Sequence, residues 1–135
     1  MKKHFLLLTA LMAHVFLAGC SSEPKDLTSQ ALTPTSPEQV KIYQKRPDNY
    51  GIVGTVVVEI TPDMKWDEQA DANKLFDLLK GKAAAKGANG LLFELDRSEF
   101  DVNATAGYHG QFYQLPIRIA PQRAAVARAI WVNPK

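Results

Sequence analysis

The 135-residue chain contains little cysteine and histidine, which limits the chemistry open to it. Cys20 is the only cysteine, so the chain cannot form an internal disulfide or a zinc site built from several thiolates. Two of the three histidines, His4 and His14, belong to an apolar N-terminal segment. His109 is therefore the only imidazole in the rest of the chain, which excludes a multi-histidine metal site there.

An excess of charge of one sign is also missing. Lys2 and Lys3 precede the apolar segment, and without them fourteen Lys and Arg residues balance fourteen Asp and Glu residues. A neutral domain has no long-range electrostatic field that would attract a polyanion. We therefore expect no nucleic-acid partner.

The apolar segment at residues 5–16 is too short to cross a bilayer, because a membrane-spanning helix needs ~20 such residues. A cationic start at Lys2 and Lys3, a short apolar run and small residues after it are typical of a secretory signal peptide. We therefore predict a signal peptide over residues 1–19.

The residues that end this segment are Leu17, Ala18, Gly19 and Cys20. They resemble the bacterial lipobox, the processing site of lipoproteins. The resemblance implies that Cys20 receives a thioether-linked diacylglycerol, that cleavage falls before it, and that its new amine is acylated. Because the next residue is Ser21 and not aspartate, the same resemblance implies transport to the outer membrane. The alternative is a cysteine buried in an N-terminal helix.

Residues 20–39 are expected to comprise the lipidated cysteine and a flexible tether. Pro24, Pro34 and Pro37 lie among Ser, Thr, Gln and charged residues, and few large apolar side chains are present to offset the entropy of ordering. A tether of this length has an r.m.s. reach of roughly 22–26 Å. The folded domain is accordingly expected over residues 40–135.

Hydrophobic periodicity in residues 40–135 predicts a small two-layer α+β domain, with one helix packed on a four- to five-stranded mixed sheet in the order β-β-α-β-β-β. The helix is expected at residues 66–86, with Gly81 as a candidate break and Gly87 just past its end. A strand, a helix and a strand in succession predict a parallel pair. Strands are expected at 40–44, 52–60, 91–96 and 112–119, with a polar loop at 97–110. The strand at 112–119 is expected at a sheet edge, because it contains Pro116. Residues 124–132 fit a helix or a strand, and Val126, Ile130, Trp131 and Val132 favour the strand.

Polar residues after the third expected strand are the candidates for a chemical site. Asp96, Glu99 and Asp101 could together hold a hard cation, although a solvated loop explains the same residues. Ser98, Asp101 and His109 are the residue types of a hydrolytic triad, but a triad is defined by geometry. We expect no catalytic residue, no metal site and no cofactor.

Aromatic residues gather late in the chain, at Tyr108, Phe112, Tyr113 and Trp131. One interpretation is packing in the core and at the sheet edge. The other is a partner-binding patch around the segment 107–113, because aromatic side chains often anchor protein interfaces.

Three stretches, VKIYQKRPDNYGIVGTV, AAAKGANGLLFEL and ARAIWV, together resemble RcsF-like small bacterial envelope lipoproteins. The resemblance implies a strand, turn and strand leading to a helix, a turn after the helix, and a terminal strand. It also implies a role in outer-membrane stress sensing. The domain of that sensor is pinned by disulfides, whereas this one has no cysteine, so redox-dependent signalling does not carry over.

Together these observations predict a lipid-anchored envelope protein at the outer membrane, facing the periplasm. A location in the outer leaflet or at the inner membrane is the alternative. Its expected role is non-catalytic binding in envelope sensing or maintenance. Its expected partners are the membrane, through the lipid on Cys20, and an envelope protein. The alternative is a small-ligand or metal-binding periplasmic module.

Overall fold

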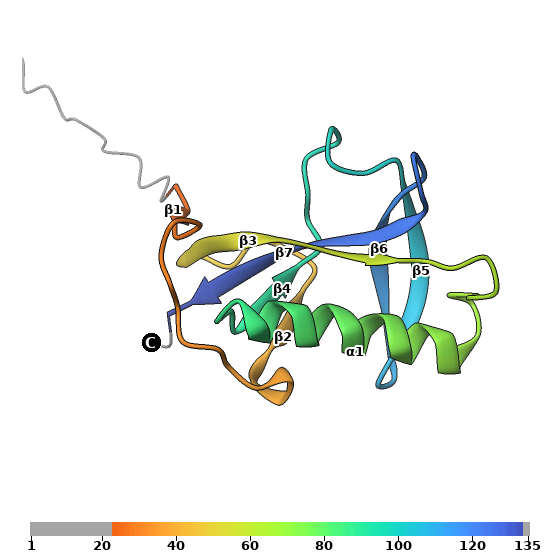
Figure 1. Cartoon of the computed structure of the whole chain (residues 1–135), viewed down its shortest axis with the longest axis horizontal. Helices are drawn as coiled ribbons and strands as arrows, with labels where there is room; N and C mark the ends of the chain where they lie inside the picture. The colour runs from red at the N-terminus through yellow and green to blue at the C-terminus, as the bar shows by residue number, and fades with distance from the viewer. Residues whose placement is uncertain (1–22, 134–135) are drawn as a thin grey trace, which may run out of the picture.

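The computed structural model describes residues 23–133, in which one α-helix packs on a seven-stranded sheet (Figure 1). The expected α+β class, with one helix on a mixed sheet, is confirmed. The expected number of strands was too low. The elements are β1 (Lys25–Asp26), a 3-10 turn η1 (Pro37–Gln39), β2 (Lys41–Tyr43), β3 (Tyr50–Glu59), α1 (Gln69–Ala85), β4 (Gly90–Leu92), β5 (Val102–Tyr108), β6 (Gln111–Arg118) and β7 (Ala124–Val132).

The last strand of the chain, β7, occupies the middle of the sheet. The strand order is β1-β3-β7-β4-β2, and β7 runs antiparallel to both β3 and β4. β3 and β4 therefore run parallel to each other, but β7 lies between them. The expectation that these two strands form a hydrogen-bonded parallel pair is wrong. The parallel pairs are instead β2 with β4 and β1 with β3. A central position suits β7, because its apolar sequence can be buried on both faces.

The segment expected to be a polar loop contains a strand. β5 pairs antiparallel with β6 along its whole length, and the two are joined by His109 and Gly110. Both residues have positive φ, 48° and 77°, which is the backbone of a two-residue hairpin turn matched to the strand twist. β6 pairs with β7 only at Ile117 and Arg118, so Pro116 lies where β6 has a strand on one side alone.

The main core lies between α1 and one face of the sheet. Three alanines of β7, Ala125, Ala127 and Ala129, face the helix with almost no exposed surface. Their small side chains leave room above the central strand for the large side chains of the helix. The buried helix residues are Ala72, Leu75, Phe76, Leu79, Ala83 and Ala84.

The helix is shorter than its apolar spacing indicates, because residues 66–68 form turns ahead of it. Gly81 lies inside α1 and does not break it, so that expectation is wrong. The prediction for Gly87 is confirmed: it follows the C-cap residue Lys86 and has a φ of 84°, a left-handed conformation that favours glycine.

The segment assigned by composition to the tether packs on the domain from residue 25 onward. We call residues 25–39 the N-terminal strap. Its strand β1 pairs with β3, the Leu27 amide donates to the Ile52 carbonyl at 2.8 Å, and the Thr35 amide donates to the Ala84 carbonyl at 2.9 Å. The strap runs around the end of the molecule where α1 ends (Figure 1). Leu27 and Leu32, the apolar residues among its polar ones, provide the contacts that order it.

Candidate functional site

The residues of the predicted lipid attachment lie outside the described part of the chain. This applies to the signal peptide at residues 1–19 and to the lipobox, Leu17 to Cys20. The lipidation of Cys20 therefore stays a prediction. Within residues 23–133, no helix combines the length and the apolarity that a bilayer crossing would need.

Tyr108, one of the four aromatic residues considered for partner binding, belongs to the core. Only 5% of its surface is exposed, and its ring stacks on that of Phe76 with centroids 4.7 Å apart. Its hydroxyl donates a 2.6 Å hydrogen bond to Oδ1 of Asp77 on α1. Burial first, and then the hydrogen bond and charge of Asp77, raise the pKa of Tyr108 well above its ordinary value.

The other three aromatic residues do not form one patch. Tyr113 is half-buried, with its ring 5.5 Å from that of Phe76, whereas Phe112 beside it is 80% exposed. Trp131 lies opposite Gly51 near the end of β7, while the β5–β6 hairpin joins β7 at its beginning. The structure thus separates Trp131 from the hairpin residues.

The three carboxylates considered for a cation site each bind a different partner within the protein. Glu99 pairs with Arg128 of β7, and Asp96 pairs with Arg46 at 3.3 Å. Oδ2 of Asp101 accepts a 2.7 Å hydrogen bond from the amide of Ile119. In the described range, no group of three or more His, Cys, Asp or Glu residues is placed to hold a metal ion.

The residue types of a hydrolytic triad are not brought together either. Asp101 precedes β5 and His109 follows it, so the two lie at opposite ends of a seven-residue strand, on the order of 25 Å apart. The His109 ring instead packs edge-on against Tyr108, with centroids 4.1 Å apart.

A cavity of about 480 Å³ lies beneath the N-terminal strap. We call it the strap cavity. It lies where the beginning of β3, the end of β7 and the residues after α1 meet the strap. Its volume falls within the ~300–1,000 Å³ typical of small-molecule sites. The lining residues are Lys25, Leu27, Gln30, Leu32, Thr33, Pro34, Thr35, Gln39, Tyr50, Gly51, Gly87, Trp131 and Asn133.

Two glycines allow the strap to lie close to the domain on either side of this cavity. A Cβ atom on Gly51 would lie 2.8 Å from Leu27 Cγ, and one on Gly87 would lie 2.8 Å from the Thr33 carbonyl oxygen. Real Cβ atoms essentially never approach other heavy atoms so closely. A larger side chain at either position would therefore push the strap away.

The side chains around the cavity divide into an apolar part and a polar rim. Leu27 is buried, and Leu32 and Trp131 pack against the core, whereas Gln30 and Asn133 are exposed. A half-buried apolar wall with amide groups at its edge is suited to binding a molecule that has an apolar and a polar part.

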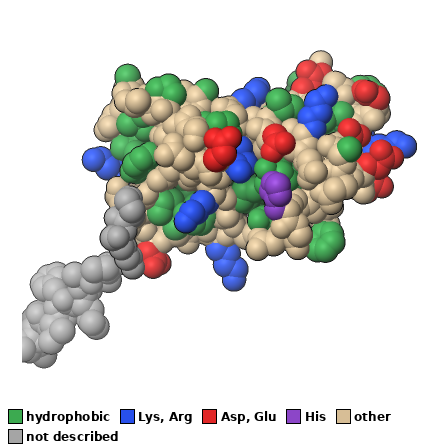
Figure 2. Space-filling view, turned by 90° about the horizontal axis from the view of Figure 1, so that it is seen from below, with side chains coloured by type: hydrophobic (Ala, Val, Ile, Leu, Met, Phe, Trp, Pro, Cys, Tyr) green, Lys and Arg blue, Asp and Glu red, His purple; other side chains and the backbone are tan. Residues whose placement is uncertain are grey.

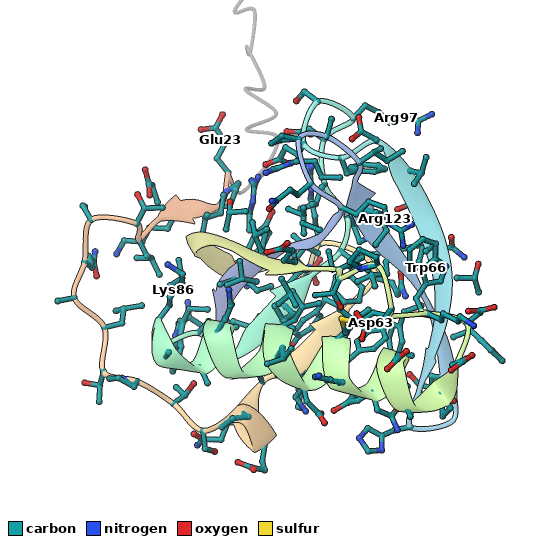
Figure 3. The ribbon with its side chains drawn as sticks, turned by 45° about the vertical axis from the view of Figure 1, so that its right-hand side comes forward. Glu23, Asp63, Trp66, Lys86, Arg97 and Arg123 are labelled. Atoms are coloured by element: carbon teal, nitrogen blue, oxygen red, sulfur yellow. The ribbon has the colours of Figure 1, made fainter. Side chains whose placement is uncertain are left out.

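The α1 side of the molecule carries charged side chains of both signs, as Figure 2 shows. Lys, Arg, Asp and Glu side chains are scattered together over the α1 side (Figure 2). At the end of the molecule away from the strap, the Arg123 guanidinium lies 4.8 Å from the Trp66 ring centre, and the two are seen side by side in Figure 3. Lys86 and Glu23 mark the strap end in the same view.

Sequence reasoning missed the strap cavity, because it treated the strap as a tether. Two leucines in this polar segment, Leu27 and Leu32, could have indicated that it packs on the domain. In the structure Leu27 packs on Gly51 and Leu32 packs on Gly87. Comparison of the chain with protein-family models, with curated proteins and with solved structures finds no match.

Proposed function

We propose that the protein is a lipid-anchored, non-catalytic binding protein of the bacterial envelope, held at the outer membrane and facing the periplasm. The anchor part of the proposal is supported by the sequence Leu17 to Cys20 after a short apolar segment. The binding part is supported by the strap cavity, which is the single observation that carries it.

The packing of the strap changes how the domain would sit relative to the membrane. A tether ending at residue 39 would let the domain float freely. Since β1 begins at Lys25, Cys20 lies only five positions before the packed chain. Five extended residues span at most ~18 Å, so the strap end of the domain would remain near the lipid surface.

The strap cavity favours the small-ligand form of binding over docking of an envelope protein. The feature that supports a protein partner is Phe112, because a large apolar side chain that is 80% exposed at a hairpin is a common interface anchor. Tyr108 is unsuited to test this, because its removal would disturb the core. If the Phe112→Ser variant folds normally but no longer binds an envelope protein that the wild type binds, the protein-partner alternative would be supported.

The anchor is tested by expressing the full chain with its own N-terminus and fractionating the envelope. We expect the wild-type protein in the outer membrane, with an N-terminal peptide that starts at Cys20 and carries the mass of the lipid. We expect Cys20→Ala to remain at precursor mass, because the residue that is modified before cleavage is gone.

A matched pair of variants at the next position tests the destination separately. Ser21→Ala should leave both lipidation and outer-membrane location unchanged, whereas Ser21→Asp should retain a lipidated protein in the inner membrane. Recovery of Cys20→Ala at mature mass with the outer membrane would show that the lipobox interpretation is wrong.

A further inference from the structure

The roof of the strap cavity is fixed on both sides, so the site exists before a ligand arrives. On one side Leu27 packs over Gly51 and its amide bonds to Ile52, and on the other Thr35 Oγ1 donates to the Ala88 carbonyl at 2.5 Å. Between these points residues 28–34 bridge the cavity. A pre-formed site avoids part of the ordering cost of binding.

The walls of the cavity accept an apolar chain. Leu27 and Leu32 come from the strap above, and Trp131 comes from β7 below, so aliphatic and aromatic surfaces face the same space. Tyr50 and Pro34 extend this lining toward the solvent. Removal of the apolar chain of a ligand from water is the general driving force for binding at such a site.

The rim of the cavity carries one charged side chain, the exposed Lys25. The amide side chains of Gln30 and Asn133 also border the cavity. Glu23 and Asp48 border a neighbouring hollow, which shares Lys25, Tyr50 and Asn133 with the cavity, but they do not line the cavity itself. The polar end of a ligand would therefore meet a cation and amide donors, a set that favours an anionic head group.

We propose that the strap cavity binds a single-chain lipid with an anionic head group, such as a fatty acid or a lysophospholipid. The acyl chain lies against Leu27, Leu32 and Trp131, and the head group lies beside Lys25. This inference rests on the proposed lipid anchor for the source of its ligand, because an anchor within about five residues of β1 keeps the cavity beside a membrane that contains such lipids.

The lipid on Cys20 itself is the main competing occupant, because five residues are enough to bring it to the cavity. Charge argues against it. A diacylglycerol thioether on an acylated amine has no charge, so it offers nothing to Lys25. A free anionic lipid uses both the apolar wall and the cation.

The test is photocrosslinking of the full chain in cells, with benzoylphenylalanine in place of Gln30 in the strap. The matched control carries the same residue in place of Phe112, which is exposed but far from the cavity. After irradiation, the protein is purified and the masses of the crosslinked peptides are measured. We expect a peptide carrying one fatty acid or lysophospholipid from position 30, and little or none from position 112. The added mass distinguishes the two lipids.

A second pair of variants tests the head group. Lys25→Glu should lower the yield of the lipid adduct at position 30 about threefold to fivefold, as expected for loss of a solvent-exposed ion pair. Lys45→Glu makes the same charge change at an exposed residue that does not line the cavity, and it should leave the yield unchanged.

Three results would overturn the proposal. They are equal lipid yields at positions 30 and 112, a crosslink from position 30 to the lipidated N-terminal peptide, and a crosslink to another protein. The mass of the N-terminal peptide is read in the same samples. An unmodified Cys20 would therefore refute the anchor independently of whether the cavity captures a lipid.

Discussion

Replacing Tyr108 by phenylalanine should weaken the fold at neutral pH and remove part of its sensitivity to alkali. The hydroxyl of Tyr108 donates to the Asp77 carboxylate at 2.6 Å, while the ring stacks on Phe76. Tyr108→Phe keeps the ring contact and removes only the hydrogen bond. Because Asp77 is exposed and regains water, we expect a loss of about 1–1.5 kcal/mol in the free energy of unfolding at pH 7.

The pH dependence follows from the raised pKa of Tyr108. The unfolded chain releases this proton near the ordinary value of ~10, whereas the folded protein retains it. The unfolded state is therefore favoured as the pH rises above 10. At pH 11 the wild-type protein should lose about 1.4 kcal/mol through this group, as long as the native pKa stays well above 11. The Tyr108→Phe variant loses none of this free energy, because phenylalanine has no proton to release.

The assay is urea denaturation of both proteins at a series of pH values from 7 to 11. The difference between their free energies of unfolding should shrink from about 1–1.5 kcal/mol at pH 7 to near zero at pH 11. Tyr113→Phe is the control at neutral pH. Its hydroxyl bonds to the exposed Gln111 side chain, so a smaller loss is expected. Parallel profiles for wild type and Tyr108→Phe up to pH 11 would refute the reasoning.

Four further substitutions test the packing and the charges of the domain by thermal and urea denaturation. Gly81→Ala should stabilise it by about 0.5–1 kcal/mol, because a Cβ at this helical position meets nothing within 4 Å; an unchanged or lower stability would contradict this. Ala127→Leu should destabilise it by ~1–3 kcal/mol, because the helix packs directly on this fully buried alanine. Glu99→Gln should lower the free energy of unfolding by about 1–3 kcal/mol, because it leaves the Arg128 side chain, only 21% exposed, without its carboxylate partner. Asp96→Asn removes the carboxylate of an exposed ion pair with Arg46 and should lower the same free energy by under ~1 kcal/mol.

The local elements of the fold could be predicted, because periodicity is written in neighbouring residues. The helix face at Leu75, Phe76 and Leu79 is buried as its spacing indicates, and the strand over 124–132 is confirmed as β7. β5 was missed because its sequence is small and polar. Its signal was the alternation of Ala104, Ala106 and Tyr108, which are all buried.

The partners of the strands could not be predicted in the same way. The chain order suggested that β3 and β4 pair across the helix, and nothing near either strand indicates that β7 is inserted between them. That choice depends on residues far apart in sequence, because the alanine-rich face of β7 is what allows α1 to approach the middle of the sheet.

The sequence by itself determined the helix, most of the strands, the neutral charge and the hypothesis of a lipid on Cys20, since each depends on a continuous stretch of residues. Only the tertiary structure decided that the strap packs on Gly51 and Gly87 and forms one wall of a cavity that Trp131 also lines. The physical reason is that a cavity is a property of surfaces brought together from distant segments, whose isolated sequences indicate a polar linker, a strand and a turn.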